Sequence, residues 1–272
     1  MRKISILLAT ILFTLSLNAQ SFKADFTKAL RDGNTDKQKE ILSLWEKSND
    51  RSADYYIANF NYYLTSCVDE QTRKLDIEKL GRSLDAIDEG IDKYPNRLDI
   101  RQGKVFALKQ MAMWDDMTKE IISAIDYSYI IDNKWIYPNE KADKDFFLNV
   151  IQQYQADLFD ETDWEIYSLE DSLMILRIRK ISEQVLKYYP QNVEALNNLG
   201  ATYFFENNDS KALEIFLTAE QIAPNNDIVL FNIANIYAKR ADKQKAKAYY
   251  ENIIKNCNTE AKNQAKELLK EL

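Results

Sequence analysis

Residues 190–226 of this chain read PQNVEALNNLGATYFFENNDSKALEIFLTAEQIAPNN. Two prolines, Pro190 and Pro224, bound the stretch and lie 34 residues apart. Its apolar residues recur at spacings of three and four, which is the pattern of amphipathic helices. Because proline ends a helix, the stretch predicts a hairpin of two helices that begins after Pro190 and ends at Pro224.

A period of 34 residues is that of the tetratricopeptide repeat. With each proline at position 32 of its repeat, Val193 becomes position 1 of the next one. The eight signature positions 4, 7, 8, 11, 20, 24, 27 and 32 then hold Leu196, Leu199, Gly200, Tyr203, Ala212, Phe216, Ala219 and Pro224. The stretch closely resembles the tetratricopeptide repeat family, with leucine in place of the usual tryptophan at position 4. The resemblance implies an all-α fold, a right-handed α-solenoid of antiparallel helical hairpins.

The residue types at these positions suit close helix packing. We expect Gly200 and Ala212 to be small because the two helices of the hairpin cross closely there. We expect Phe216 and Ala219 to face the next hairpin. The residues expected to fill the seam between the helices are Leu196, Leu199 and Tyr203.

The same register continues into a second repeat at residues 227–257. The corresponding positions hold Leu230, Ile233, Ala234, Tyr237, Ala246, Tyr250 and Ile253. Residues 258–272 are expected to form a final amphipathic helix, because a repeat stack needs a terminal element with a polar outer face. Residues 191–272 are thus predicted to hold two tandem repeats, 193–226 and 227–257, and a capping helix.

Upstream, the residues indicate further helices but a weaker repeat. The helices predicted there are Phe22–Arg31, Asp36–Lys47, Ser52–Val68, Leu75–Tyr94, Leu98–Met113, Asp115–Tyr127, Ala142–Phe159 and Trp164–Tyr189. Pro95 and Pro190 lie 95 residues apart, which is not a multiple of 34. We expect degenerate hairpins of the same solenoid at residues 20–130 and an irregular helical hairpin region at 131–190. A separate helical domain joined near residues 128–141 is the alternative.

Residues 1–19 have the features of a secretory signal peptide. Arg2 and Lys3 form a basic start, residues 4–17 form an apolar run, and Ala19 precedes the expected cleavage site. The run is shorter than the roughly 20 residues that span a bilayer; an uncleaved membrane anchor is the alternative. The segment resembles bacterial export signals, particularly those of Bacteroidetes. It predicts an exported protein of the periplasm or cell envelope, without stable membrane insertion after cleavage.

The composition excludes several functional classes. The chain has no histidine, which removes Ser-His-Asp and Cys-His catalysis and every histidine-containing metal site. Its formal net charge of −7 argues against a nucleic-acid partner, which requires concentrated Lys and Arg. It has no phosphate-binding loop, nucleophile elbow or zinc-binding helix motif. We predict that the chain is not an enzyme and holds no cofactor or metal.

Two other features have structural explanations. Cys67 and Cys257 would lie near opposite ends of a helical stack, whereas a disulfide tolerates a Cα separation of only about 7 Å. Each is expected to be a small buried apolar residue. The acidic cluster at residues 160–165 lacks the glycine and the spacing of a calcium loop and is expected to be a solvated turn.

In this family the first helix of each hairpin lines a concave groove, through positions 2, 5, 6, 9, 12 and 13. Here these positions hold Glu194, Asn197, Asn198, Ala201, Phe204 and Phe205, and then Ile228, Phe231, Asn232, Asn235, Ala238 and Lys239. The candidate contacts for a bound peptide are Asn197, Asn198, Phe205, Phe231, Asn232, Asn235 and Lys239. Asparagine offers a peptide backbone both a donor and an acceptor, and phenylalanine supplies an apolar anchor. Ordinary packing is the competing explanation.

The resemblance implies a scaffold that binds a protein or peptide partner. The carboxylate clamp of chaperone-binding members is not supported, because position 5 holds Asn197 and Phe231 instead of lysine. A carbohydrate-binding helical protein that captures envelope glycans is the alternative. An exposed subset of the aromatic residues at positions 55–63 could bind sugar rings or a proline-rich segment. An enzyme that uses carboxylates alone is a third hypothesis.

Overall fold

A computed structural model describes residues 21–48, 50–68, 74–138, 140–162, 168–257 and 260–272 of the 272-residue chain. The predicted signal peptide, residues 1–19, lies outside the described residues and stays a prediction. Asp163 and Glu165 of the acidic cluster also lie outside them. Among the described residues, no helix combines the length and the apolar composition that crossing a membrane requires.

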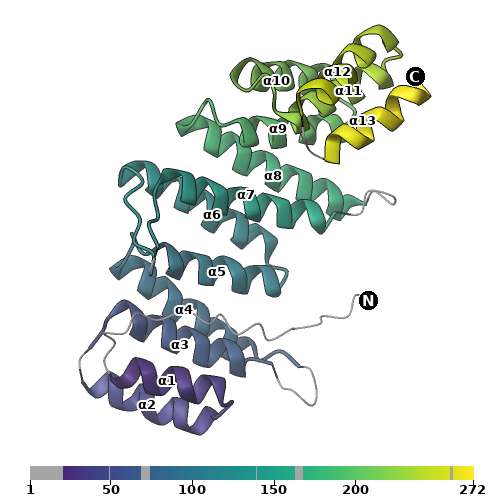
Figure 1. Ribbon diagram of the computed structural model, residues 1–272. Coiled ribbons are helices and arrows are strands. Elements are labelled where there is room, and N and C mark those ends of the chain that lie inside the picture. The colour runs from purple at the N-terminus through teal and green to yellow at the C-terminus, as the bar shows by residue number, and fades with distance from the viewer. Residues whose placement is uncertain (1–20, 49, 69–73, 139, 163–167, 258–259) are drawn as a thin grey trace. The chain divides into compact units, whose positions relative to one another are not determined.

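The described residues form α-helices joined by turns and short connections (Figure 1). The helices are α1 (Ser21–Arg31), α2 (Thr35–Lys47), α3 (Ala53–Ser66), α4 (Ile77–Lys93), α5 (Leu98–Gln110), α6 (Trp114–Ile130), α7 (Lys144–Asp160), α8 (Leu169–Tyr188), α9 (Val193–Phe205), α10 (Asp209–Ile222), α11 (Asp227–Lys239), α12 (Lys243–Asn256) and α13 (Glu260–Glu271). The prediction of an all-α helical-repeat fold is confirmed.

The chain divides into two compact units, residues 1–147 and 148–272. The division falls inside α7 and therefore not in the connection at residues 128–141. Whether the N-terminal half is a separate domain or part of the same solenoid stays a prediction.

Within the described part of the chain, four hairpins have the same type of turn between their two helices. A residue with positive φ follows the first helix in each case: Gly33 (65°), Ala112 (54°), Asn207 (60°) and Ala241 (58°). The N–H of the next residue donates to the carbonyl five residues earlier, from Asn34 to Ala29, Met113 to Leu108, Asn208 to Tyr203 and Asp242 to Tyr237. The hairpins α1–α2 and α5–α6, where the repeat signature is weak, therefore reverse the chain in the same way as α9–α10 and α11–α12.

In the unit formed by residues 1–147, large aromatic and aliphatic side chains fill the space between hairpins. Phe60 is fully buried among the isoleucines of α4 and α5. Gly90 of α4 is required for close packing, because a Cβ there would lie 2.9 Å from the Cβ of Tyr56. A buried ion pair joins α5 to α6, with Arg101 Nη1 2.6 Å from Glu120 Oε1.

The described residues of the connection between α6 and α7 are 131–138 and 140–143. Its backbone pairs with the start of α5, because Ile136 donates to Asn96 and Leu98 donates to Ile136. Trp135 is buried, and its ring stacks on Phe147 at 5.3 Å between centroids. The connection is therefore a packed part of this unit.

The helix predicted at residues 164–189 begins later, at Leu169. The Ser168 side chain accepts a hydrogen bond from the Asp171 N–H, and the Asp171 carboxylate accepts one from the Ser168 N–H. This reciprocal pair is a capping box, which fixes the first turn of a helix. Residues 163–167 lie outside the described part of the chain.

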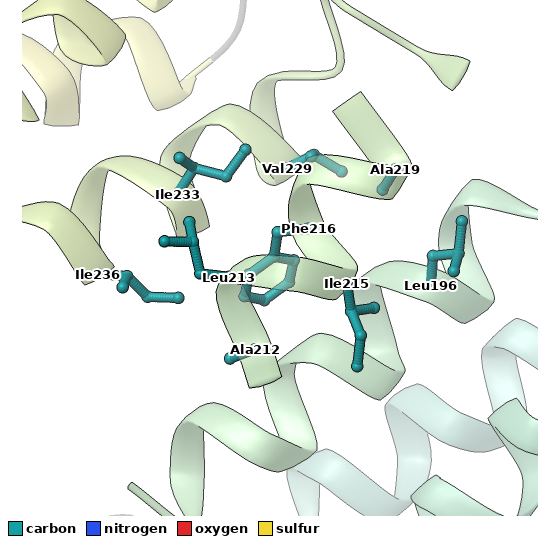
Figure 2. Close-up of a cluster of buried hydrophobic side chains, with 9 residues drawn as sticks. All are labelled: Leu196, Ala212, Leu213, Ile215, Phe216, Ala219, Val229, Ile233 and Ile236. Carbon is teal, nitrogen blue, oxygen red and sulfur yellow. The ribbon is translucent and has the colours of Figure 1, made fainter. Parts of the chain in front are cut away.

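In the unit formed by residues 148–272, the predicted packing of the repeats is confirmed. A Cβ on Gly200 would lie 2.6 Å from the Phe216 ring, so α9 and α10 cross as closely as the signature implies. Figure 2 shows Phe216 among side chains of α10 and α11, where its cluster includes Val229 and Ile233. Phe216 thus packs within its own hairpin and also faces the next one.

The last helix, α13, covers the final hairpin as predicted. Ala265 of α13 is fully buried against Ala246, Tyr250 and Ile253, while most of the polar residues of α13 are exposed. Cys257 belongs to the same cluster, and Cys67 in the other unit is also buried. The prediction that both cysteines are small buried residues is confirmed.

Candidate functional site

The two first helices of the C-terminal repeats start in the same way. Asn192 caps α9 by accepting a hydrogen bond from the Ala195 N–H at 2.7 Å. Asn226, 34 residues later, caps α11 by accepting one from the Val229 N–H at 3.1 Å. Asparagine is among the best helix N-caps because its side chain satisfies an otherwise unpaired N–H. Because both helices begin directly after their capping asparagine, residues at the same repeat position lie the same number of turns from the start of α9 and of α11.

We call the seven predicted contact residues on these helices the α9/α11 face. They are Asn197, Asn198 and Phe205 of α9 and Phe231, Asn232, Asn235 and Lys239 of α11. At its centre, Asn232 Nδ2 donates to Asn197 Oδ1 at 2.8 Å. This hydrogen bond joins the two repeats and leaves donor and acceptor capacity on both half-buried amides, since each amide has two N–H groups and two lone pairs.

Lys239 is held by the turn of the preceding hairpin. Its ammonium lies 2.8 Å from Asp209 Oδ1 and 3.0 Å from Asn207 Oδ1. It also lies 4.9 Å from the centre of the Phe204 ring, within cation–π range. The charge of Lys239 is therefore already compensated, and the residue ties the end of α11 to the α9–α10 turn.

Two of the predicted contacts point into the second repeat. Asn235 Oδ1 accepts a hydrogen bond from the buried Tyr250 hydroxyl at 2.8 Å. Phe231 packs edge-on against the Tyr250 ring at 6.0 Å between centroids. Burial, with a smaller contribution from Glu271, raises the pKa of Tyr250, which keeps its hydroxyl a donor. The structure therefore gives Phe231 and Asn235 a packing role.

The remaining two candidates differ in their surroundings. Phe205 is half-buried, with its ring 5.9 Å from Phe204 and 6.3 Å from Phe159 between centroids. Asn198 is half-buried, and its amide makes no hydrogen bond with the residues that the structure describes. Asn198 and the Asn197–Asn232 pair together form the part of the face with polar groups available to a ligand.

Arg179 of α8 is a residue that the repeat signature did not find. Its guanidinium lies 4.1 Å from the Tyr203 ring centre and 2.7 Å from Glu206 Oε2, and its Nε donates to Thr202 Oγ1 at 3.2 Å. These contacts anchor the C-terminal half of α9 to α8. No signal inside a 34-residue repeat reveals it, because α8 precedes both repeats.

A pocket of about 380 Å³ lies between α2, α3 and the start of α4. Tyr55, Tyr62 and Tyr63 of the aromatic set line it. Tyr55, Tyr56 and Phe60 are buried in the core, whereas Tyr62 and Tyr63 are only half-buried. The full lining is Lys39, Leu42, Ser43, Glu46, Tyr55, Asn59, Tyr62, Tyr63, Asp76, Glu78, Lys79 and Arg82. The sequence indicated that part of the aromatic set is core, and the structure shows which residues are not.

A family model described as tetratricopeptide repeat matches residues 193–226 and 229–260. These two segments are tetratricopeptide repeats. The matched segments correspond to α9–α10 and to α11–α12 with the start of α13. The first has the bounds that Pro190 and Pro224 predict, and the second spans 229–260 where the predicted repeat is 227–257. A comparison with curated proteins finds no match.

Solved structures of tetratricopeptide repeat proteins are similar to this chain at low sequence identity. YrrB, described as having an unusual peptide-binding site, is 14% identical with a TM-score of 0.45, covering 85% of this chain and 98% of its own. The C-terminal part of a repeat protein from Cytophaga hutchinsonii is 16% identical with a TM-score of 0.44, covering 87% and 79%. The TPR2AB domain of yeast Sti1, described as a complex with pHSP90, is 11% identical with a TM-score of 0.34, covering 92% and 96%. Similarities this low transfer no ligand or binding residue to this chain.

Proposed function

We propose that this tetratricopeptide repeat protein is a non-catalytic scaffold of the bacterial cell envelope that binds a polypeptide partner on the α9/α11 face. The observation that carries the proposal is the hydrogen bond between Asn197 and Asn232. The next residue of α9, Asn198, has an amide that makes no hydrogen bond within the described part of the chain. An extended peptide presents N–H and C=O groups in alternation, and asparagine side chains can pair with both.

The Asn197–Asn232 bond supports binding because it orients both amides in advance. A side chain that is already fixed loses less conformational entropy when a ligand binds, so the affinity gained per contact is larger. Lys239, itself part of the face, ties the end of α11 to the α9–α10 turn, and Arg179 of α8 pairs with Glu206 at the end of α9. The face is thus rigid, with Asn198 as its adaptable contact.

The non-catalytic part of the proposal is supported by the composition. The chain has no histidine, and the described residues contain no group of three or more Cys, Asp and Glu arranged to hold a metal ion. The envelope location is supported by the signal-peptide features of residues 1–19. Cell fractionation tests the location. Finding the full-length chain in the cytoplasm, with residues 1–19 uncleaved, would contradict the envelope location and leave the binding proposal unaffected.

Affinity capture from chemically crosslinked cell envelopes tests the binding proposal. The wild-type chain should retain a discrete partner that Asn198→Arg loses, since the larger charged side chain obstructs the face. Thr218→Arg is the matched control, because Thr218 is exposed on α10, away from the face. Retention of the same partner by the Asn198→Arg variant would show that the face is assigned wrongly.

A further inference from the structure

The pocket between α2, α3 and α4 is built from different elements than the α9/α11 face. Both α2 and α4 pack on α3, and α3 forms the floor between them. The volume of about 380 Å³ lies at the low end of the range of roughly 300–1,000 Å³ that is typical of small-molecule sites. It suits a compact ligand better than a long extended chain.

Two tyrosine rings of α3 give the pocket an aromatic wall. Tyr62 and Tyr63 meet edge to face with 5.1 Å between centroids, and both are half-buried. Arg82 lies 5.8 Å from the Tyr63 ring centre and holds that ring in place. Such rings offer a flat apolar surface with a polar hydroxyl at its edge, which matches the C–H face and the hydroxyl rim of a pyranose.

The charges around the pocket balance. Three cationic and three anionic side chains line it: Lys39, Lys79, Arg82, Glu46, Asp76 and Glu78. Most are already paired, with Arg82 2.7 Å from Glu78 and Lys79 3.7 Å from Asp76. Glu46 pairs with Arg51 at 3.3 Å. A ligand with a strong charge of either sign gains little from this lining, so the balance favours a neutral one.

The polar atoms of the lining both donate and accept. Ser43 and Tyr62 carry hydroxyls, and Asn59 uses its N–H on the Tyr55 carbonyl at 3.1 Å, which leaves its Oδ1 as an acceptor. A sugar hydroxyl is both donor and acceptor and can use such a mixture. A proline-rich segment presents carbonyl acceptors and few N–H donors, so the carboxylates and the Asn59 carbonyl have nothing to bind on it.

We propose that the pocket between α2, α3 and α4 is a binding site for a neutral saccharide, with Tyr62 and Tyr63 as the ring platform and Ser43 and Asn59 at the hydroxyl rim. This proposal does not depend on polypeptide binding at the α9/α11 face, and either proposal can fail without the other.

Saturation-transfer NMR on the purified mature chain tests this proposal with a panel of neutral oligosaccharides: cellotetraose, xylotetraose, maltotetraose and chitotetraose. At least one should receive saturation, strongest on ring protons. Ser43→Trp fills the pocket from an exposed position and should weaken binding at least about tenfold. Leu44→Trp, the adjacent exposed residue of α2 outside the pocket, should change affinity by less than about twofold.

A second pair of variants distinguishes the contribution of the Tyr62 ring from that of its hydroxyl. Tyr62→Phe should retain most of the saturation transfer, and Tyr62→Ala should lose it while thermal unfolding remains cooperative. Decaproline is the competing probe. The proposal is overturned if no saccharide of the panel binds, if Ser43→Trp binds as well as Leu44→Trp, or if decaproline binds the pocket and no saccharide does.

Discussion

Asn232 donates a 2.8 Å hydrogen bond to Asn197, a residue 35 positions earlier in the chain. The two residues occupy positions 6 and 5 of neighbouring repeats, so the bond links two repeats at the face proposed to bind a partner. Repeat proteins derive part of their stability from such interfaces between neighbours. The same bond therefore contributes to stability and to the preparation of the site.

A double-mutant cycle should detect this bond. Asn197→Ala and Asn232→Ala should each lower the free energy of unfolding by about 1 kcal/mol, the usual net contribution of a hydrogen bond. The double variant should lose less than the sum, by about 0.5 kcal/mol or more, because the partners are in direct contact. Urea denaturation measures all three. Asn198→Ala is the control and should stay within about 0.5 kcal/mol of wild type.

Two glycines in helices should respond to alanine with opposite signs. Gly200→Ala places a methyl group 2.6 Å from the Phe216 ring and should destabilise the chain by about 1–3 kcal/mol through overpacking. Gly81→Ala in α4 meets nothing within 4 Å and should stabilise by about 0.5–1 kcal/mol through helix propensity. Thermal denaturation of both variants checks the pair. Equal effects at the two sites would mean that the close crossing of α9 and α10 is wrong.

The shared hairpin turn predicts stabilising substitutions. Ala112 and Ala241 have φ of 54° and 58°, a left-handed conformation in which a Cβ costs about 1 kcal/mol or more. Ala112→Gly and Ala241→Gly should therefore raise the free energy of unfolding by up to about 1 kcal/mol each. Ala248→Gly, in the exposed interior of α12, is the control and should lower it by about 0.5–1 kcal/mol. Loss of stability in both turn variants would contradict the turn geometry.

Alkaline pH should destabilise the N-terminal unit through Tyr56. Burial, followed by the hydrogen bond to Glu89, raises the pKa of Tyr56 from 10.0 to about 12. Because the folded chain holds this proton more tightly than the unfolded chain, the contribution is complete below pH 10. It is lost as the pH rises from 10 towards 12. Urea unfolding of wild type and Tyr56→Phe across this window should show a steeper fall for wild type. Parallel curves would exclude Tyr56 as the cause.

The sequence was sufficient for features that depend on neighbours along the chain. The spacing of Pro190 and Pro224 set the register. The expectations that Gly200 lies where the two helices cross closely and that Phe216 faces the next hairpin followed from it. The helix caps were equally local, since Asn192 and Asn226 serve N–H groups three residues away. Such features repeat with the period and can be read without a structure.

Features that depend on distant partners could not be read in this way. Phe231 and Asn235 occupy positions that line a groove in the family, but Tyr250 engages both in this chain. From the sequence alone, Arg101 and Glu120 would be placed on the solvated surface, because charged residues are rarely buried unless they are paired. In the structure they form a buried ion pair with each other. The pocket between α2, α3 and α4 could not be predicted either, because its lining residues come together only when the three helices pack.

Site-specific photocrosslinking in the native cell envelope tests the central claim most directly. A benzophenone amino acid at Glu194, an exposed residue at position 2 of α9 on the same face as Asn198, should yield one discrete crosslinked polypeptide. The same probe at Thr218 on α10 should yield none, and Asn198→Arg should abolish the adduct formed at position 194. The absence of any adduct at position 194, or an identical adduct at position 218, would contradict polypeptide binding on the α9/α11 face.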